Sequence, residues 1–566
     1  MKRRWLFGFV AFAILLISLV VIWLRLSTLK VERTIIAELP KGINRLVKTD
    51  LDGDGEIELM ATCSPPSLVS PVWSIDENEG IDDPRVWLIR SPLTNPQVKQ
   101  LPYVCRLNFP NDSTDFPPLR AIFVEDGEWR KSVLRLWLTK RLGWLRVHDG
   151  QAAFEPICAA EKFNHWLFYN GKVATLLIFV YQWHPSLFSQ PTSAPKERIA
   201  FRLKPDGTWM PIDARKVRLP AIGGSRRAVG DFDGDGLMDI VHLRSQVVQG
   251  KWQSRLEVYW GNNSPVTELP VRQLDLFKRF WATDVDNDGL WEFVFLDKGS
   301  LASSGWELTV WRFYPYKRYF DVISQIAGKV TLPMPKSFLL FGSRKSVPPP
   351  PPLIEPEFSA VDLDGNGRKD FVLFWLKMYP MPTGEIDIVM PPPSCISVQV
   401  IWWEGNKLRL REFDPHEIAL LGPPITSWTK NSQRFIIAAN LVEGRHEEKD
   451  SKGRCFILRL PKGNGFFDLR RWEKIAELPA NPMLIGDWDN DGQFELLLRK
   501  RISHSSGTHD VPYFACFDGH KVRHTKVTLT SPAELAFALP VQTRDDAALF
   551  VLWQTKDKTL LERIRW

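Results

Sequence analysis

The sequence of 566 residues lacks the short motifs that mark common catalytic sites. The patterns H-E-x-x-H, G-x-S-x-G, G-x-G-x-x-G and the P-loop are all missing, so the chemistry tied to each is not expected. Six cysteines without C-x-x-C spacing argue against a zinc site and against a thioredoxin-like motif. The net charge of +7 is spread without a long basic block, which argues against nucleic-acid binding.

The scarce cysteines say little about disulfide pairing. An oxidising compartment would permit disulfides, but scattered positions do not identify the pairs. We expect Cys63 and Cys105 to be the first candidates, because both fall in the first repeat unit described below.

What the sequence does contain is one acidic loop in five copies, with acids at positions 1, 3, 5 and 9 and Gly at position 6. Asn replaces Asp at position 5 of the fourth copy. The candidate ligands are Asp50, Asp52, Asp54 and Glu58; Asp231, Asp233, Asp235 and Asp239; Asp284, Asp286, Asp288 and Glu292; Asp362, Asp364, Asn366 and Asp370; and Asp487, Asp489, Asp491 and Glu495.

This spacing predicts calcium binding. Ca²⁺ takes roughly 6–8 oxygen ligands, and alternate residues of a tight loop can turn several oxygens inward while glycine permits the turn. An EF-hand would need a glutamate at position 12, where these copies have Ala61, His242, Phe295, Leu373 and Leu498. We therefore expect five calcium sites that are not EF-hands, the fourth being the weakest because Asn366 removes one charge.

The loops run into short apolar segments such as Asp239–Leu243 and Glu292–Leu296, which predict buried strands. The stretch Gly230–Val241 resembles the FG-GAP/VCBS repeat of integrin α-subunit propellers and of many bacterial surface proteins. The resemblance covers the five loops and the strands that follow them. It implies a calcium-binding β-propeller and does not identify a ligand.

Repetition of short strands at intervals of about 60 residues favours an all-β propeller over a row of separate domains. Degenerate loops are expected near residues 121, 166, 426 and 541, which with the five acidic loops makes nine candidate starts, and the one near 121 is expected to be false because the interval after it is the shortest. We expect eight blades, with seven as the alternative. The segment Glu32–Leu39 is expected to close the ring by pairing with the C-terminal strands around Leu549–Trp553 and Leu560–Trp566.

The N-terminus carries an apolar run, Trp5–Leu24, behind the basic residues Lys2–Arg4. At about 1.5 Å per residue such a run spans the ~30 Å hydrocarbon core of a bilayer. The basic cluster favours a cytoplasmic N-terminus. We expect a cytoplasmic stub (1–4), one N-terminal transmembrane helix (5–26) and an extracytoplasmic or cell-surface propeller (27–566) that is held to the membrane by that helix.

Several functions are compatible with such a chain. The first is a membrane-anchored, calcium-stabilised binding or scaffolding module for an unidentified protein or glycan ligand. The alternative is a carbohydrate-active propeller, either a polysaccharide lyase or a lectin. A lyase would need a basic and aromatic cleft around a catalytic base, and a lectin would need repeated tryptophan pockets. The 24 tryptophans are expected mainly to fill gaps between blades.

Overall fold

The structure is a computed structural model of the full chain, and the description below is confined to part of it. The described residues are 31–63, 85–105, 117–126, 141–148, 151–158, 162–169, 174–181, 197–214, 227–235, 239–248, 251–261, 264–268, 279–298, 305–314, 319–330, 353–378, 394–418, 424–430, 433–439, 455–461, 465–504, 507–527, 533–543 and 546–566.

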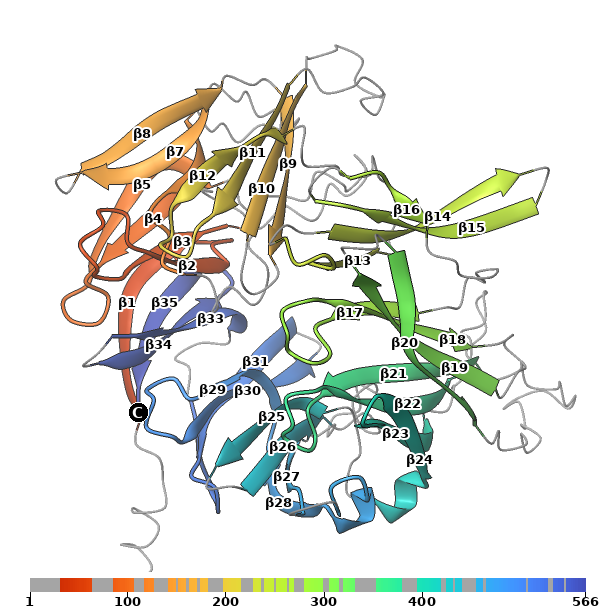
Figure 1. Ribbon diagram of the computed structural model, residues 1–566. Helices are drawn as coiled ribbons and strands as arrows, with labels where there is room; N and C mark the ends of the chain where they lie inside the picture. Colours follow the sequence, from red (N-terminus) through yellow and green to blue (C-terminus); the bar gives the residue numbers. More distant parts are fainter. Residues whose placement is uncertain are drawn as a thin grey trace, which may run out of the picture.

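Within these residues the chain forms an all-β propeller, in which successive antiparallel sheets follow one another around a common centre (Figure 1). Seven of the sheets are four-stranded blades. Three consecutive blades are β9 (Lys162–Tyr169), β10 (Ala174–Tyr181), β11 (Glu197–Leu203) and β12 (Trp209–Ile212); β13 (Arg227–Gly230), β14 (Asp239–Val248), β15 (Lys251–Tyr259) and β16 (Thr267–Glu268); and β17 (Arg279–Thr283), β18 (Glu292–Lys298), β19 (Gly305–Tyr314) and β20 (Tyr319–Lys329).

Three further blades follow along the chain. They are β21 (Leu353–Val361), β22 (Asp370–Met378), β23 (Ser394–Glu404) and β24 (Lys407–Phe413); β25 (Pro424–Lys430), β26 (Gln433–Ala439), β27 (Cys455–Arg459) and β28 (Glu473–Leu478); and β29 (Asn481–Gly486), β30 (Phe494–His504), β31 (Gly507–Phe517) and β32 (Val522–Lys526). Two 3₁₀ turns, η4 (Pro415–Glu417) and η6 (Leu469–Arg471), lie in the connections.

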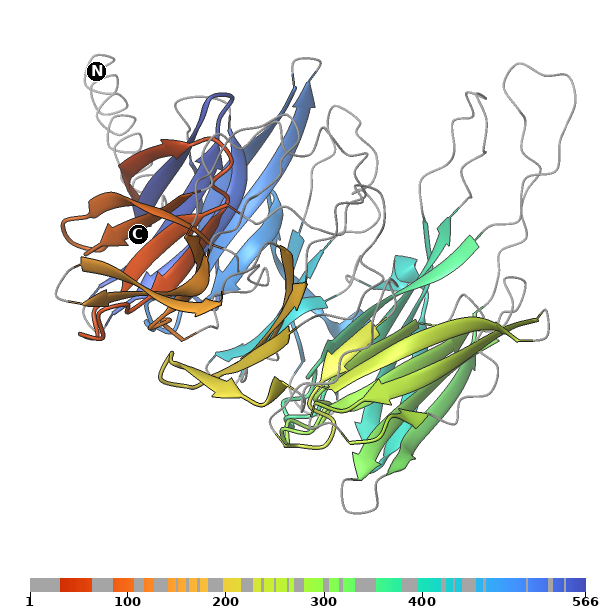
Figure 2. The ribbon, with the colours of Figure 1, turned by 90° about the horizontal axis from the view of Figure 1, so that it is seen from above.

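The seventh blade joins the two ends of the chain. Its order is β1 (Glu32–Pro40), β35 (Lys558–Arg565), β34 (Ala547–Gln554) and β33 (Glu534–Gln542). Strand β1 pairs antiparallel with β35, with Glu32 opposite Arg565 and Pro40 opposite Lys558. The predicted closure by the segment around Ile35 is therefore confirmed, and the red and dark-blue strands lie together in Figure 2.

One sheet departs from the four-stranded pattern. Strands β2 (Arg45–Thr49), β3 (Glu58–Thr62), β4 (Arg85–Arg90), β5 (Gln97–Cys105), β6 (Ile122–Asp126), β7 (Arg141–His148) and β8 (Gln151–Cys158) form a single seven-stranded sheet. As expected, the candidate near residue 121 is not a unit of its own, because Val104 and Cys105 of β5 pair with Glu125 and Val124 of β6. The four-stranded blades within the described residues number seven, so the prediction of eight blades is wrong and the alternative of seven holds.

The core lies between neighbouring sheets. All six central residues of β34 are buried, whereas the edge strand β33 alternates buried and half-buried residues. A continuous apolar run is expected where a strand is covered on both faces, and alternation where one face is more open. The first strands of neighbouring sheets, such as β13 and β17 or β21 and β25, lie next to each other, which places them nearest the centre.

Tryptophan fills these spaces as expected. Of the 24 tryptophans, those whose side chains are described are buried or half-buried, and none of them is exposed. Trp375 and Trp553 are among the largest fully buried side chains. No disulfide joins the six cysteines in this structure, so the expected pairing of Cys63 with Cys105 is wrong.

The predicted N-terminal transmembrane helix gains no support. Within the described ranges the structure holds no helix with the length and apolar character that a membrane crossing requires. The segment predicted to span the bilayer, residues 5–26, lies outside the described residues. The fold is thus corrected to a seven-bladed all-β propeller without a transmembrane helix in the described part of the chain.

Candidate metal centres

Each of the five acidic loops connects the first strand of a sheet to the second. Position 1 directly follows β2, β13, β17, β21 or β29, and position 9 opens β3, β14, β18 or β22 or stands second in β30. Strands on both sides confirm that the loops are not EF-hands. They also confirm the predicted strands after the loops.

In each loop a hydrogen bond between two residues seven positions apart in the sequence fixes the shape of the loop. In every copy the position 9 carboxylate accepts from the backbone amide of position 2. The pairs are Leu51 with Glu58 at 2.9 Å, Phe232 with Asp239 at 2.8 Å, Val285 with Glu292 at 2.7 Å, Leu363 with Asp370 at 3.0 Å and Trp488 with Glu495 at 2.7 Å. The acid that opens the second strand therefore folds back over the start of the loop.

Positions 4 and 6 adopt the left-handed conformation. Position 6 is glycine with φ of +88° at Gly55, +93° at Gly289 and +78° at Gly492. Position 4 is also left-handed, as at Asn287 and Asn490, both with φ of 58°. Position 4 is restricted to Gly or Asn in all five copies, which are the residues that tolerate this region, so its role in the turn could have been predicted from the sequence.

Three carboxylates converge in each loop, with one oxygen of each within 4.8 Å of the others. In four copies the converging residues are positions 1, 3 and 9, and in the first copy they are positions 1, 3 and 5. The predicted ligands outside these groups are Glu58, Asp235, Asp288, Asn366 and Asp491. The acid at position 5 instead accepts hydrogen bonds from the backbone of its own loop. Asp491 Oδ1, for example, accepts from the amide of Gln493 at 2.6 Å.

Burial holds the position 9 acids toward their neutral form. Loss of solvation raises the pKa of Glu495 and of Asp370 to about 8, and that of Glu58 and of Glu292 to about 7. The hydrogen bond from position 2 lowers each pKa but does not offset burial. A cation among these groups would favour their ionised form.

The donor set of the fifth loop fits a hard cation. Asp487, Asp489 and Glu495 converge, and Asp487 Oδ1 is a buried oxygen with no hydrogen-bond donor in the part of the chain that the structure describes. Its neighbour Asp489 accepts from the indole Nε1 of Trp566 at 3.0 Å through Oδ2. A buried carboxylate oxygen without a donor is costly unless something positive contacts it, and calcium is an oxygen-seeking cation.

In the first and fourth loops an arginine side chain lies close to the acid at position 1. Arg120 Nη2 lies 3.5 Å from Asp50 Oδ2 in the first loop, and Arg434 Nη1 lies 3.2 Å from Asp362 Oδ1 in the fourth. In the fourth loop the side-chain Nδ2 of Asn366 also donates to Asp364 Oδ2 at 2.8 Å.

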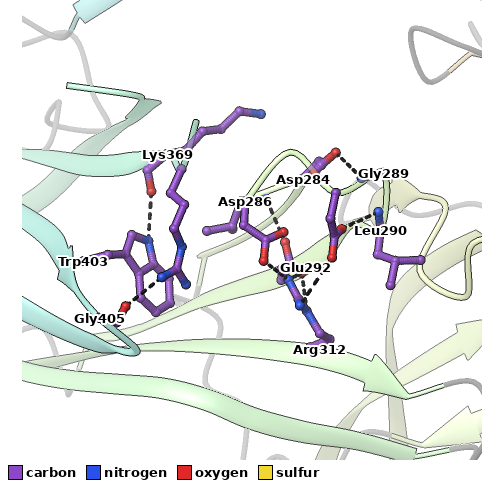
Figure 3. A network of polar contacts seen from close by, with 12 residues as sticks. Asp284, Asp286, Gly289, Leu290, Glu292, Arg312, Lys369, Trp403 and Gly405 are labelled. Carbon is purple, nitrogen blue, oxygen red and sulfur yellow. Dashed lines mark hydrogen bonds and ion pairs between the residues drawn. The ribbon is translucent and has the colours of Figure 1, made fainter. Parts of the chain in front are cut away.

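The third loop holds an arginine among its acids. Arg312, on β19, points into the loop toward Asp286 and Glu292 (Figure 3). Burial alone would lower the pKa of Arg312, but the hydrogen bonds and charges of Asp286 and Glu292 raise it above the ordinary value. The loop pattern did not predict Arg312, because this residue follows Glu292 by 20 residues and belongs to another strand.

Consecutive loops are joined by backbone contacts. The amide of Trp291 in the third loop donates to the carbonyl of Asp231 in the second at 3.0 Å. The amide of Lys369 in the fourth loop donates to the carbonyl of Val285 in the third at 2.6 Å. Trp403 Nε1 in turn donates to the carbonyl of Lys369 at 3.1 Å (Figure 3). Backbone hydrogen bonds thus join the second loop to the third and the third to the fourth.

The comparisons with known proteins do not assign the chain to a family. No protein-family model matches it, and no curated protein does. Among solved structures, Trypanosoma rangeli sialidase is 10% identical over 74% of this chain and 56% of its own, with a TM-score of 0.24. A Bombyx mori GH32 beta-fructofuranosidase in complex with sucrose is 10% identical over 71% of this chain and 88% of its own, also with a TM-score of 0.24.

The chain therefore spans a little over half the length of the sialidase structure it matches. An ACO/RPE65 chimera is 11% identical over 67% of this chain and 78% of its own, with a TM-score of 0.28. At such TM-scores the likeness does not bear on chemistry, substrate or partner.

Proposed function

We propose that this chain is a calcium-stabilised propeller of the FG-GAP/VCBS type that serves as a binding or scaffolding module. The observation that supports this most is the convergence of three carboxylates in the same turn of five different sheets. Carboxylates held within 4.8 Å of one another repel unless they are protonated or neutralised by a cation. Repeated in every loop, this arrangement suits a structural ion.

A calcium ion in these loops is expected to be structural and not catalytic. Their acids are tied to backbone amides of the loop itself, as Glu495 is to Trp488 at 2.7 Å. A bound ion would hold the first strand of a sheet to the second and, through contacts such as Lys369 to Val285, one sheet to the next. In this proposal calcium supplies rigidity, and the surface of the propeller supplies binding.

The placement of the domain outside the cytosol belongs to the same proposal. Calcium loops of modest affinity fill where the ion is near millimolar, which is the case outside cells. The absence of disulfides does not oppose this, because the loops would replace the covalent links that exported proteins often use.

A carbohydrate-active enzyme is the second candidate, and one cluster favours it. On β15 the hydroxyl of Tyr259 donates to Glu257 Oε2 at 2.7 Å, and the ring of His242 lies 6.5 Å from that of Tyr259. In the sheet Glu257 stands opposite His242 on one side and Glu268 on the other. A phenol beside a carboxylate that can accept its proton is a possible nucleophile or acid.

One screen separates the two candidates. The full chain, in calcium and in chelator, is tested against immobilised glycans and soluble polysaccharides, with retention and cleavage both measured. Retention without cleavage, lost in chelator, supports the binding module. Cleavage that disappears in Tyr259→Phe and in Glu257→Gln supports the enzyme. Failure of the wild-type chain to bind calcium at millimolar concentration would overturn the calcium part of the proposal.

A further inference from the structure

The third acidic loop contains a built-in positive charge. Arg312 Nη2 lies 2.7 Å from Asp286 Oδ2, its Nε donates to Glu292 Oε1 at 2.6 Å, and its Nη1 lies 3.5 Å from Asp288 Oδ2. One guanidinium thus contacts three of the four acids of the loop (Figure 3).

This contact is well shielded from water. The side chain of Glu292 is 0% exposed and that of Arg312 is 18% exposed. The planar guanidinium suits such a site, because its fork of donors can engage two carboxylates at once. In the first and fourth loops an arginine pairs with the acid at position 1.

The same loop also keeps ligand atoms that the arginine does not use. Asp284 Oδ1 and Asp286 Oδ1 are buried oxygens without a hydrogen-bond donor among the described residues, and Asp284 is only 9% exposed. The other oxygen of Asp284 accepts from the amide of Gly289 at 3.0 Å. The loop is therefore shaped for a cation, while the guanidinium of Arg312 already engages oxygens of Asp286, Asp288 and Glu292.

We propose that Arg312 is an internal counter-cation that competes with calcium for the third loop. Calcium can take Asp286 Oδ2 and Glu292 Oε1 as ligands only after the guanidinium leaves them. The third loop is then the weakest calcium site of the five, weaker than the fourth with its Asn366, and it keeps its shape when calcium is removed. This inference rests on the proposed calcium binding of the loops.

A lysine of the fourth loop also lies close to the third loop. Lys369 donates through Nζ to Thr283 Oγ1 at 2.7 Å, directly before Asp284. Burial lowers the pKa of Lys369, and the charges of Asp284 and Glu292 offset this only in part. The third loop therefore has Arg312 of its own blade among its acids and Lys369 of the next blade beside the end of β17.

The first test counts bound calcium by equilibrium dialysis of the full chain. At a calcium level that just fills the fifth loop, Asp489→Asn should lose about one ion per chain, whereas Asp286→Asn should lose none. Arg312→Met should bind about one more ion per chain, or lower the calcium dissociation constant of the weakest site about tenfold, which corresponds to about 1.4 kcal/mol. Loss of an ion in Asp286→Asn at that level, or no change in Arg312→Met, would overturn the proposal.

Failure of the calcium proposal gives a different pattern. If wild type and Asp489→Asn both bind no calcium, the loops of the native chain are not calcium sites. Arg312→Met still decides the competition in that case: a new ion in this variant supports it, and none overturns it.

The second test needs no calcium and protects against a variant that folds poorly. In chelator, Arg312→Met should lower the melting temperature more than Arg409→Met, a matched variant of the exposed pair Arg409 and Glu404 at 2.6 Å. Asp286→Asn should recover part of that loss in the double variant, because it removes the charge that Arg312 neutralised. Arg312→Lys should fall between wild type and Arg312→Met, since an ammonium cannot engage both carboxylates. Additive effects of the two substitutions would contradict the counter-cation role.

Discussion

The indole of Trp553 donates to Glu562 Oε2 at 2.8 Å in the blade that joins the two ends of the chain. Glu562, which is 3% exposed, also pairs with Arg33 of β1 at 2.7 Å. One buried carboxylate therefore connects the central strand β34, the C-terminal strand β35 and the N-terminal strand β1. Side chains from opposite ends of the sequence hold the ring closed.

Glu562→Ala should lower the free energy of unfolding by about 1–3 kcal/mol. The substitution leaves the buried indole N–H of Trp553 without its acceptor and removes the partner of Arg33. The matched control is Glu404→Ala in an exposed ion pair, where a change below about 1 kcal/mol is expected. Urea unfolding of both variants decides the matter, and equal effects would show that closure does not depend on Glu562.

Deleting residues 555–566 should cause aggregation. The deletion removes β35, which pairs with β34 on one side and β1 on the other, and so leaves two unpaired edges. Lys558→Ala is the control, because it removes the ion pair with Glu38 but keeps the strand. Size-exclusion chromatography checks the result: a monomeric, cooperatively unfolding truncation would place the closure elsewhere.

Chelation should lower the melting temperature of the wild-type chain. With free calcium about tenfold above Kd, each filled site adds roughly 1.4 kcal/mol by mass action. Asp233→Ala and Asp489→Ala should each remove part of this gain. Asp364→Ala should remove less, because the Asn366 amide already engages Asp364 Oδ2. An unchanged midpoint in chelator would mean that the loops are held by their own hydrogen bonds.

Without calcium, stability should decrease as pH rises from about 5 to about 8. Burial raises the pKa of Glu495 to about 8 from an ordinary value of 4.5, so between these values the folded chain binds more protons than the unfolded chain. The free energy of unfolding then falls with increasing pH. Calcium binds the ionised carboxylate of Glu495, so calcium should remove this decrease in the free energy of unfolding.

Urea unfolding at pH 5 and pH 8, in chelator and in calcium, measures this effect. Glu495→Gln should flatten the chelator profile, since an amide keeps an acceptor for the Trp488 amide but does not titrate. Parallel profiles in calcium and in chelator would argue against ionisation of these acids by the metal.

Gly492→Ala should destabilise the fifth loop by about 1–2 kcal/mol, with or without calcium. Gly492 has φ of +78°, and a Cβ there would meet no atom within 4 Å, so the cost comes from backbone conformation alone. Asn490→Gly is the control and should be close to neutral, because glycine adopts the φ of 58° found at Asn490 without strain. Thermal melts in chelator that show equal losses would contradict this account.

Much of the candidate site could be predicted because its interactions are local. The bond from the position 2 amide to the position 9 carboxylate spans seven residues, as from Trp488 to Glu495. The turn depends on Gly or Asn at positions that the sequence displays. Apolar segments after each loop predicted the second strands for the same reason: buried strands need apolar side chains on both faces.

The sequence by itself therefore determined the acidic loops, the strands around them and the general architecture of repeated sheets. Only the tertiary structure decided the rest. The pairing of β5 with β6 placed seven strands in one sheet, and Arg312 of β19 came to lie among the acids of the third loop. Both depend on which strands pair and in which register, and this pairing is set by the packing of whole sheets, which no local pattern encodes.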